Sequence, residues 1–174
     1  ITEAEITGRG RNLDLIGKEI VALTEARVRM SGMLERIDQW IAEDSTTQSL
    51  GGRPAAISYR AVLTSMLLLT REGAPLYLTR MASLLQHRLA PESRELLGLA
   101  TTEHVFVNQE AENKRWFYNT RRAYNRMRDL MDPFPVQRYT SKSYAQIEEI
   151  LRNHDHELEI MRKARLDEFT RRFL

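Results

Sequence analysis

Cysteine is absent from the 174 residues of this chain, so neither disulfides nor thiolate-bound metals can hold it together. This suits a reducing compartment, and we expect a cytoplasmic location. The longest apolar run, residues 61–69, is interrupted by Thr64 and Ser65 and is far shorter than the roughly 20 residues of a membrane span. We therefore expect no membrane segment. Residue 1 is Ile rather than Met and no secretory signal follows, so we expect the chain to be part of a longer protein.

The usual marks of catalysis are also missing. Gly51 and Gly52 lack the flanking strand and the Gly-Lys-Ser/Thr pattern of a phosphate-binding loop and are interpreted as a hinge. His154 and His156 are two positions apart, which on a helix points them away from each other, so a shared metal site is not expected. No pattern in the sequence pairs a candidate nucleophile with a candidate general base. We expect no active site, no metal and no cofactor, and hence no enzyme.

Alternation of apolar and polar residues, the mark of strands, occurs only weakly at residues 104–107, whereas spacings of three and four recur throughout. The sequence predicts an all-α fold, a multi-helix bundle with long amphipathic helices. Residues 1–50 form a first unit, in which one long helix runs from residue 12 to about 43. Its apolar positions form a heptad seam, comprising Ile16, Ile20, Leu23, Met30, Leu34, Ile37 and Ile41, with Arg27 in the same row. This 16–41 seam packs either inside the fold or against a second copy in a homodimer.

Residues 51–174 form a second helical unit after a polar linker at 45–54. Ser58 is placed to cap a helix that ends near Gly73 and is apolar on nearly every face, so this helix should be the buried centre. A short helix capped by Thr79 follows, and the two resemble a helix-turn-helix pair. Pro91 opens a brief turn that ends at Gly98. Further helices are predicted at 108–131 and from Ser143, with a capping box, toward residue 174.

Charge is distributed unevenly, although the net charge is only +2. Residues 1–52 have a balance of −3, residues 53–131 a balance of +5, and residues 132–174 a balance of zero. The predicted 108–131 helix contributes a stretch with six cations and no carboxylate, namely Lys114, Arg115, Arg121, Arg122, Arg126 and Arg128. Helical spacing places them in two adjacent rows, which make a broad cationic strip.

Two interpretations of this strip stay open. In the first, the cations only solvate a helix whose Trp116, Tyr124 and Met127 are core. In the second, the strip follows the phosphates of double-stranded DNA, and Tyr118, together with Asn119 or Asn125, donates hydrogen bonds to phosphates or base edges.

Several short sequence motifs resemble motifs in the N-terminal helical region of a group of bacterial transposases typical of actinobacteria. They are Gly51-Gly-Arg-Pro54, Ala61-Val-Leu-Thr-Ser-Met-Leu-Leu-Leu69, Leu78-Thr-Arg-Met-Ala-Ser-Leu-Leu-Gln-His-Arg-Leu89, Leu97-Gly-Leu99, Leu130-Met-Asp-Pro-Phe-Pro135 and Arg165-Leu-Asp-Glu-Phe169. The resemblance covers about residues 51 to 174. It implies a region that binds transposon ends and precedes an RNase H-like catalytic domain, which these residues do not contain.

The resemblance gives most weight to Arg53, Arg80, His87 and Arg88, which surround the helix-turn-helix-like pair. The loop after Pro135 departs from the family pattern, because it offers only Arg138 where a run of Lys and Arg is expected. The alternative to DNA binding is a helical interaction or oligomerisation module that uses the 16–41 seam and has no nucleic-acid partner.

Overall fold

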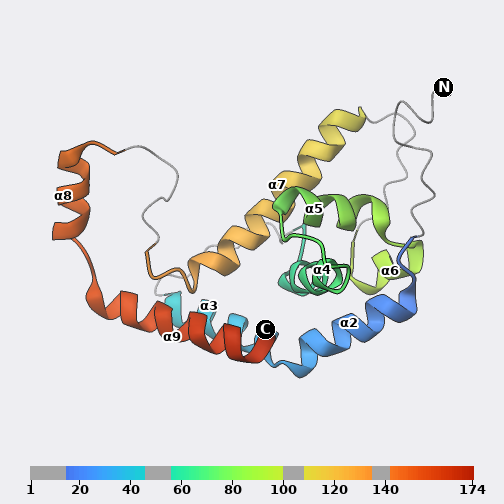
Figure 1. Cartoon of the computed structure of the whole chain (residues 1–174), viewed down its shortest axis with the longest axis horizontal. Coiled ribbons are helices and arrows are strands. Elements are labelled where there is room, and N and C mark those ends of the chain that lie inside the picture. The colour runs from blue at the N-terminus through green and yellow to red at the C-terminus, as the bar shows by residue number, and fades with distance from the viewer. Residues whose placement is uncertain (1–14, 46–55, 100–107, 135–141) are drawn as a thin grey trace.

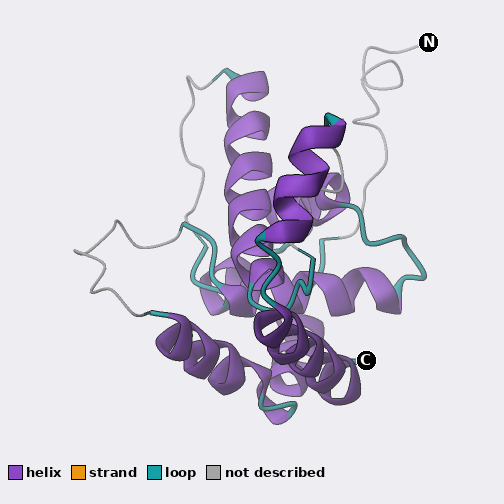
Figure 2. Ribbon diagram, turned by 90° about the vertical axis from the view of Figure 1, so that its left-hand side faces the viewer, coloured by secondary structure: helices purple, strands orange, loops and turns teal. Residues whose placement is uncertain are grey.

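The computed structural model describes residues 15–45, 56–99, 108–134 and 142–174. Within these ranges the chain is all α, as expected, and contains no β-strand, only a single parallel bridge between Ile16 and Leu89 (Figure 2). The elements are α2 (Lys18–Met30), α3 (Met33–Asp44), α4 (Tyr59–Arg71), α5 (Leu78–Ser83), the π-helix η1 (Leu84–Arg88), α6 (Pro91–Leu96), α7 (Gln109–Asp129), α8 (Tyr144–Arg152) and α9 (His156–Phe173). None of these helices is both long and apolar enough to cross a bilayer.

Helix α4 is the buried centre, as the sequence predicts. The Ser58 side chain accepts a hydrogen bond from the Ala61 amide at 3.1 Å, and Gly73 follows the helix with φ of 66°. Thr64 and Ser65 are fully buried because each donates its hydroxyl hydrogen bond to a backbone carbonyl one turn earlier. Helices α2, α5 and α7 pack around α4, which is seen almost end-on in Figure 1.

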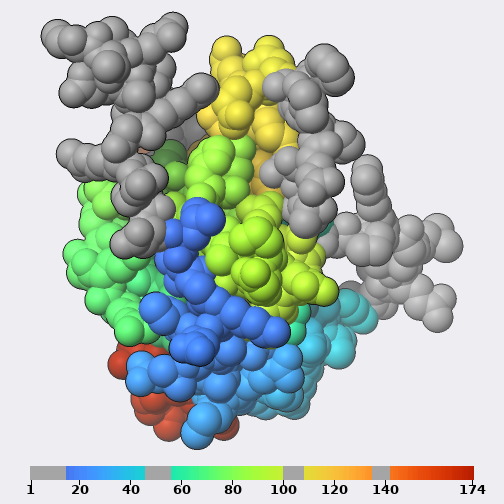
Figure 3. All heavy atoms as spheres, turned by 90° about the vertical axis from the view of Figure 1, so that its right-hand side faces the viewer, coloured from blue at the N-terminus to red at the C-terminus, as the bar shows by residue number. Residues whose placement is uncertain are grey.

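The predicted long helix of residues 12–43 is divided in two. Ser31 and Gly32 separate α2 from α3, and Gly32 has φ of 69°, a conformation that glycine adopts without a Cβ clash. The turn lets α2 cover α4 and α6, as Figure 3 shows for the face on which α2 and α6 meet, while α3 packs against α9. The seam is divided accordingly: Ile16 and Ile37 are buried, but Met30 is exposed.

The segment from α5 to α6 folds back onto the start of α2. The Ile16 amide donates to the Arg88 carbonyl at 2.7 Å, and the Ile16 carbonyl accepts from the Ala90 amide and from the Ser93 hydroxyl. The second helix of the predicted pair begins at Leu78 rather than being capped by Thr79, and it continues without a break into η1.

The predicted last helix is also two helices. The capping box of Ser143 and Gln146 begins α8 as expected, but α8 ends at Arg152 and Asp155 caps a new helix, α9. No residue of α8 is buried, and Figure 1 shows it away from the other helices. The expectation that His154 and His156 lie on one helix and point away from each other is therefore wrong, because His154 lies in the turn before α9.

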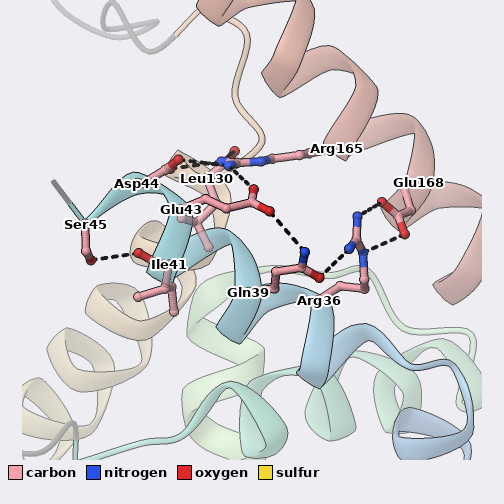
Figure 4. A network of polar contacts seen from close by, with 9 residues as sticks. All are labelled: Arg36, Gln39, Ile41, Glu43, Asp44, Ser45, Leu130, Arg165 and Glu168. Carbon is pink, nitrogen blue, oxygen red and sulfur yellow. Dashed lines mark hydrogen bonds and ion pairs between the residues drawn. The ribbon is translucent and has the colours of Figure 1, made fainter.

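Arg165 fastens α9 to the rest of the fold. It occupies a core-facing position of the α9 stripe, its side chain is only 4% exposed, and it donates to Asp44 at 2.8 and 2.9 Å, to Glu43 at 3.1 Å and to the Leu130 carbonyl at 3.1 Å (Figure 4). Its guanidinium also lies 5.6 Å from the centre of the Trp40 ring. One buried arginine thus joins α3, the end of α7 and α9.

Candidate nucleic-acid interface

Helix α7 is the straight support of the candidate interface. Asn108 caps it, with its side chain accepting from the Glu110 amide at 3.0 Å. Trp116, Thr120, Ala123 and Met127 form its buried stripe, as predicted. Since this stripe faces α4 and α5, the opposite side of the helix faces solvent along its length.

Three arginines on the solvent side of α7 are unengaged. Arg121, Arg122 and Arg126 are exposed, and none of them forms an ion pair or side-chain hydrogen bond with another described residue. Burial raises the pKa of the Tyr59 hydroxyl at the start of α4, and the charge of Arg126 opposes this rise. Tyr118, 55% exposed, lies one turn before them on the same side of the helix.

The other three cations of the strip have carboxylate partners, which the sequence interpretation did not foresee. Lys114 pairs with Glu110 at 2.7 Å, Arg115 pairs with Glu112, and Arg128 pairs with Asp129 at 2.8 Å. These partners lie just outside residues 114–128, within a turn of the cations that they meet. Because the side chains of all three cations are at least 41% exposed, such pairs contribute only about 0–1 kcal/mol each and can exchange for a phosphate.

Arg88 is engaged within the protein. Its guanidinium donates two hydrogen bonds of 2.7 Å to the Glu72 carboxylate, and these bonds join η1 to the residue that follows α4. The hydrogen bond from Arg88 holds the pKa of Glu72 below its usual value and, reciprocally, raises that of Arg88. We therefore assign Arg88 a structural role. Arg80 and His87 are exposed, and Arg53 lies outside the described residues.

A surface groove separates α5 and η1 from the first half of α7. Gln86 of η1 donates to Asn113 of α7 at 2.8 Å across its floor. The walls carry polar and aromatic side chains, with Thr79, Ser83 and His87 on one side and Lys114, Phe117 and Tyr118 on the other. His87 and Lys114 thus lie in one groove, together with Tyr118, while Arg121 continues the Lys114 row two turns further along α7.

Arg94 connects two of the helices that line this groove, η1 and α7, and the sequence pattern does not indicate it. It is buried, donates to the Leu85 and Gln86 carbonyls at 2.8 Å, and lies 5.0 Å from the centre of the Trp116 ring. Burial lowers its pKa. A single arginine in a six-residue helix produces no periodic signal, so only the structure identifies it as the link between η1 and α7.

A second surface bears on the alternative function. The outward side of α2 exposes Ile20 at 39%, Leu23 at 56% and Met30 at 87%, three of the predicted seam residues, with Arg27 among them. Their spacing of three and seven places them along one line of the helix. This α2 stripe has no partner in the described part of the chain.

Comparison of the chain with protein-family models, with curated proteins and with solved structures found no match. The fold and the surface together describe an all-α protein with a cationic helix face beside a polar groove.

Proposed function

We propose that this chain is the DNA-binding helical region of a transposase-like protein, which recognises transposon ends through α7 and the neighbouring groove. The resemblance of residues 51–174 to the transposase region and the chemistry of the α7 surface support this proposal. In it, the transfer chemistry belongs to a catalytic domain that these residues do not include.

The observation that carries the proposal is the set of free guanidinium groups on α7. Arg121, Arg122 and Arg126 span about 7.5 Å along the helix axis. Arg122 and Arg126 are one turn apart on the same side of the helix, so their potentials reinforce each other within the Debye length of about 8 Å at physiological salt, and Arg121 extends the positive surface toward the adjacent side. A phosphate backbone gains by exchanging its condensed counterions for such a cluster.

The groove supplies groups suited to reading DNA next to the cluster. Thr79 and Ser83 expose hydroxyls on one wall, and Tyr118 exposes its phenol on the other. Hydroxyl groups bond to phosphates and to base edges, whereas the arginines of α7 position the duplex. The proposal assigns contacts with the DNA backbone to α7 and contacts with the bases to the groove wall that α5 forms with Thr79 and Ser83.

Fluorescence anisotropy with a labelled duplex tests the role of α7. Binding is measured at several salt concentrations for the natural chain and for the variant that combines Arg121→Ala, Arg122→Ala and Arg126→Ala. If each arginine neutralises one phosphate, the slope of log K against log salt becomes shallower by about 2.7, or about 0.9 for each contact. An unchanged slope and affinity would remove α7 from the interface.

A matched control separates local contacts from net charge. Arg152→Ala, Lys163→Ala and Arg171→Ala together remove the same charge from exposed positions of α8 and α9, and none of these residues forms an ion pair with another described residue. This control should retain nearly all of the natural affinity. Equal losses in both triple variants would mean that net charge alone drives binding.

The exposed α2 stripe favours a second candidate function, an oligomerisation module. In that case Leu23→Glu combined with Met30→Glu converts a concentration-dependent dimer into a monomer, as measured by sedimentation velocity. A natural chain that stays monomeric at high concentration excludes this candidate, and binding to DNA that does not weaken as salt rises excludes the first.

A further inference from the structure

The junction between α8 and α9 brings three metal-ligating side chains together. Residues 153–155 turn the chain, so His154 points back toward the first turn of α9, where His156 and Glu159 lie. His154 Nε2 lies 2.6 Å from Glu159 Oε2, and His156 Nδ1 lies 3.3 Å from the same oxygen. Each residue offers one ligand atom, and the three atoms all lie within 4.8 Å of one another.

The structure assigns this cluster as a binding site for a divalent transition metal, with Zn²⁺ as the best-fitting ion. Its ligands are His154 Nε2, His156 Nδ1 and a carboxylate oxygen of Glu159. Bonds of about 2.0–2.1 Å in tetrahedral geometry require ligand atoms about 3.4 Å apart. The contacts of 2.6 and 3.3 Å to Glu159 are both shorter than this value, and all three ligand atoms lie within 4.8 Å of one another, so small side-chain rotations open the space for an ion.

The donor set selects the class of metal. Two imidazoles and one carboxylate suit Zn²⁺, Ni²⁺ and Cu²⁺, whereas Ca²⁺ and Mg²⁺ prefer a shell of oxygen ligands alone. Three protein ligands leave the fourth tetrahedral position to water, because the cluster faces solvent. Stacking on Phe134, with ring centres 6.3 Å apart and an angle of 13°, orients the His154 ring.

The carboxylates around the cluster favour a cation, although the dipole of α9 opposes one. The N-terminus of α9 carries a partial charge of about +0.5 from the helix dipole, which opposes cation binding. Asp155, Glu157 and Glu159 place three carboxylates within the same turn. These carboxylates carry more charge than the helix end, and they favour a dication even though Lys142 lines the same pocket.

An ion at this position joins the turn to α9. His154 belongs to the connection that sets the direction in which α8 leaves α9, and α8 has no buried residue that would otherwise hold it. Coordination of His154 together with His156 and Glu159 therefore orders the junction. The site is independent of the DNA-binding proposal, because it uses none of the α7 cations.

Zinc binding by the full chain, purified without a histidine tag, tests the assignment. Isothermal titration calorimetry with Zn²⁺ should show one saturable site. His154→Ala, His156→Ala and Glu159→Gln should each weaken binding by at least about tenfold, the lower limit for loss of even an outer-shell partner. His87→Ala removes an exposed histidine on η1 and should leave the affinity unchanged.

Imidazole NMR gives a second readout that a nonspecific surface site would not reproduce. Zinc should fix His154 with its proton on Nδ1 and His156 with its proton on Nε2, because the other nitrogen of each ring is coordinated. Absence of saturable binding, equal weakening by His87→Ala, or opposite ring nitrogens would each overturn the proposal. Helical circular dichroism of the variants should match that of the natural chain, since the three side chains lie at the surface.

Discussion

Replacement of Arg165 by alanine tests whether one buried arginine holds α9 to the fold. The variant removes the two hydrogen bonds to the Asp44 carboxylate, the hydrogen bond to Glu43, the hydrogen bond to the Leu130 carbonyl and the packing on Trp40. Removing one partner from a buried ion pair costs about 3–5 kcal/mol, mostly because the other charge is left without compensation. The side chains of Asp44 and Glu43 are 33% and 49% exposed, so both carboxylates regain water. We therefore expect a loss of about 3 kcal/mol.

Urea unfolding followed by tryptophan fluorescence and by circular dichroism measures this loss, since Trp40 lies directly against the Arg165 guanidinium. Arg171→Ala, an exposed α9 arginine without an ion pair to another described residue, serves as control and should change stability by less than about 0.5 kcal/mol. A double-mutant cycle with Asp44→Ala should return a coupling of about 1.5–3 kcal/mol. A loss below about 1 kcal/mol for Arg165→Ala, or a coupling near zero, would refute the role assigned to this network.

Other predictions concern the pH dependence, the turn and the core. The hydrogen bond from Arg36, together with the charge of nearby Arg172, holds the pKa of Glu168 in the folded chain below its pKa in the unfolded chain. The stability that the ionised Glu168 contributes is therefore fully present at a pH above the unfolded-state pKa, and it is lost as the pH falls through the folded-state pKa. Unfolding free energies measured from about pH 5 to pH 3 should therefore fall more steeply for the natural chain than for Glu168→Gln; parallel curves would contradict this. Gly32→Ala should cost about 1–2 kcal/mol in urea unfolding, because φ is 69° and the new Cβ meets Arg172 Nη1 at 3.1 Å. Leu63→Ala, at a fully buried position of α4, should cost about 3 kcal/mol by the same assay, and a cost below about 1 kcal/mol would mean that α4 is not the centre of the core.

Much of the local structure could be predicted from the sequence. Ser58 caps α4, Ser143 begins α8 with a capping box, and the stripe from Trp116 to Met127 is buried on α7. These features depend on neighbours within a turn or two, which the sequence displays directly. The helix breaks were harder to predict, because the apolar spacing continues on both sides of Gly32.

The candidate interface was predictable in part. Helical spacing alone places Arg121 and Arg122 on the side away from the buried stripe and Arg126 at its flank, and the structure leaves all three exposed. The pairing of Lys114 with Glu110 depends on a residue just outside the cationic stretch, so the composition of that stretch does not indicate it. Whether the free arginines meet DNA stays a prediction.

The sequence by itself determined the helical class, the central helix and the solvent side of α7, because backbone hydrogen bonds and apolar periodicity act over a few residues. Only the tertiary structure decided which distant groups meet. Arg165 contacts Asp44, which is more than a hundred residues away in the sequence. His154 contacts Glu159 because the chain turns between two helices. Such contacts form when helices pack, and no local pattern encodes the direction in which a turn sends the next helix.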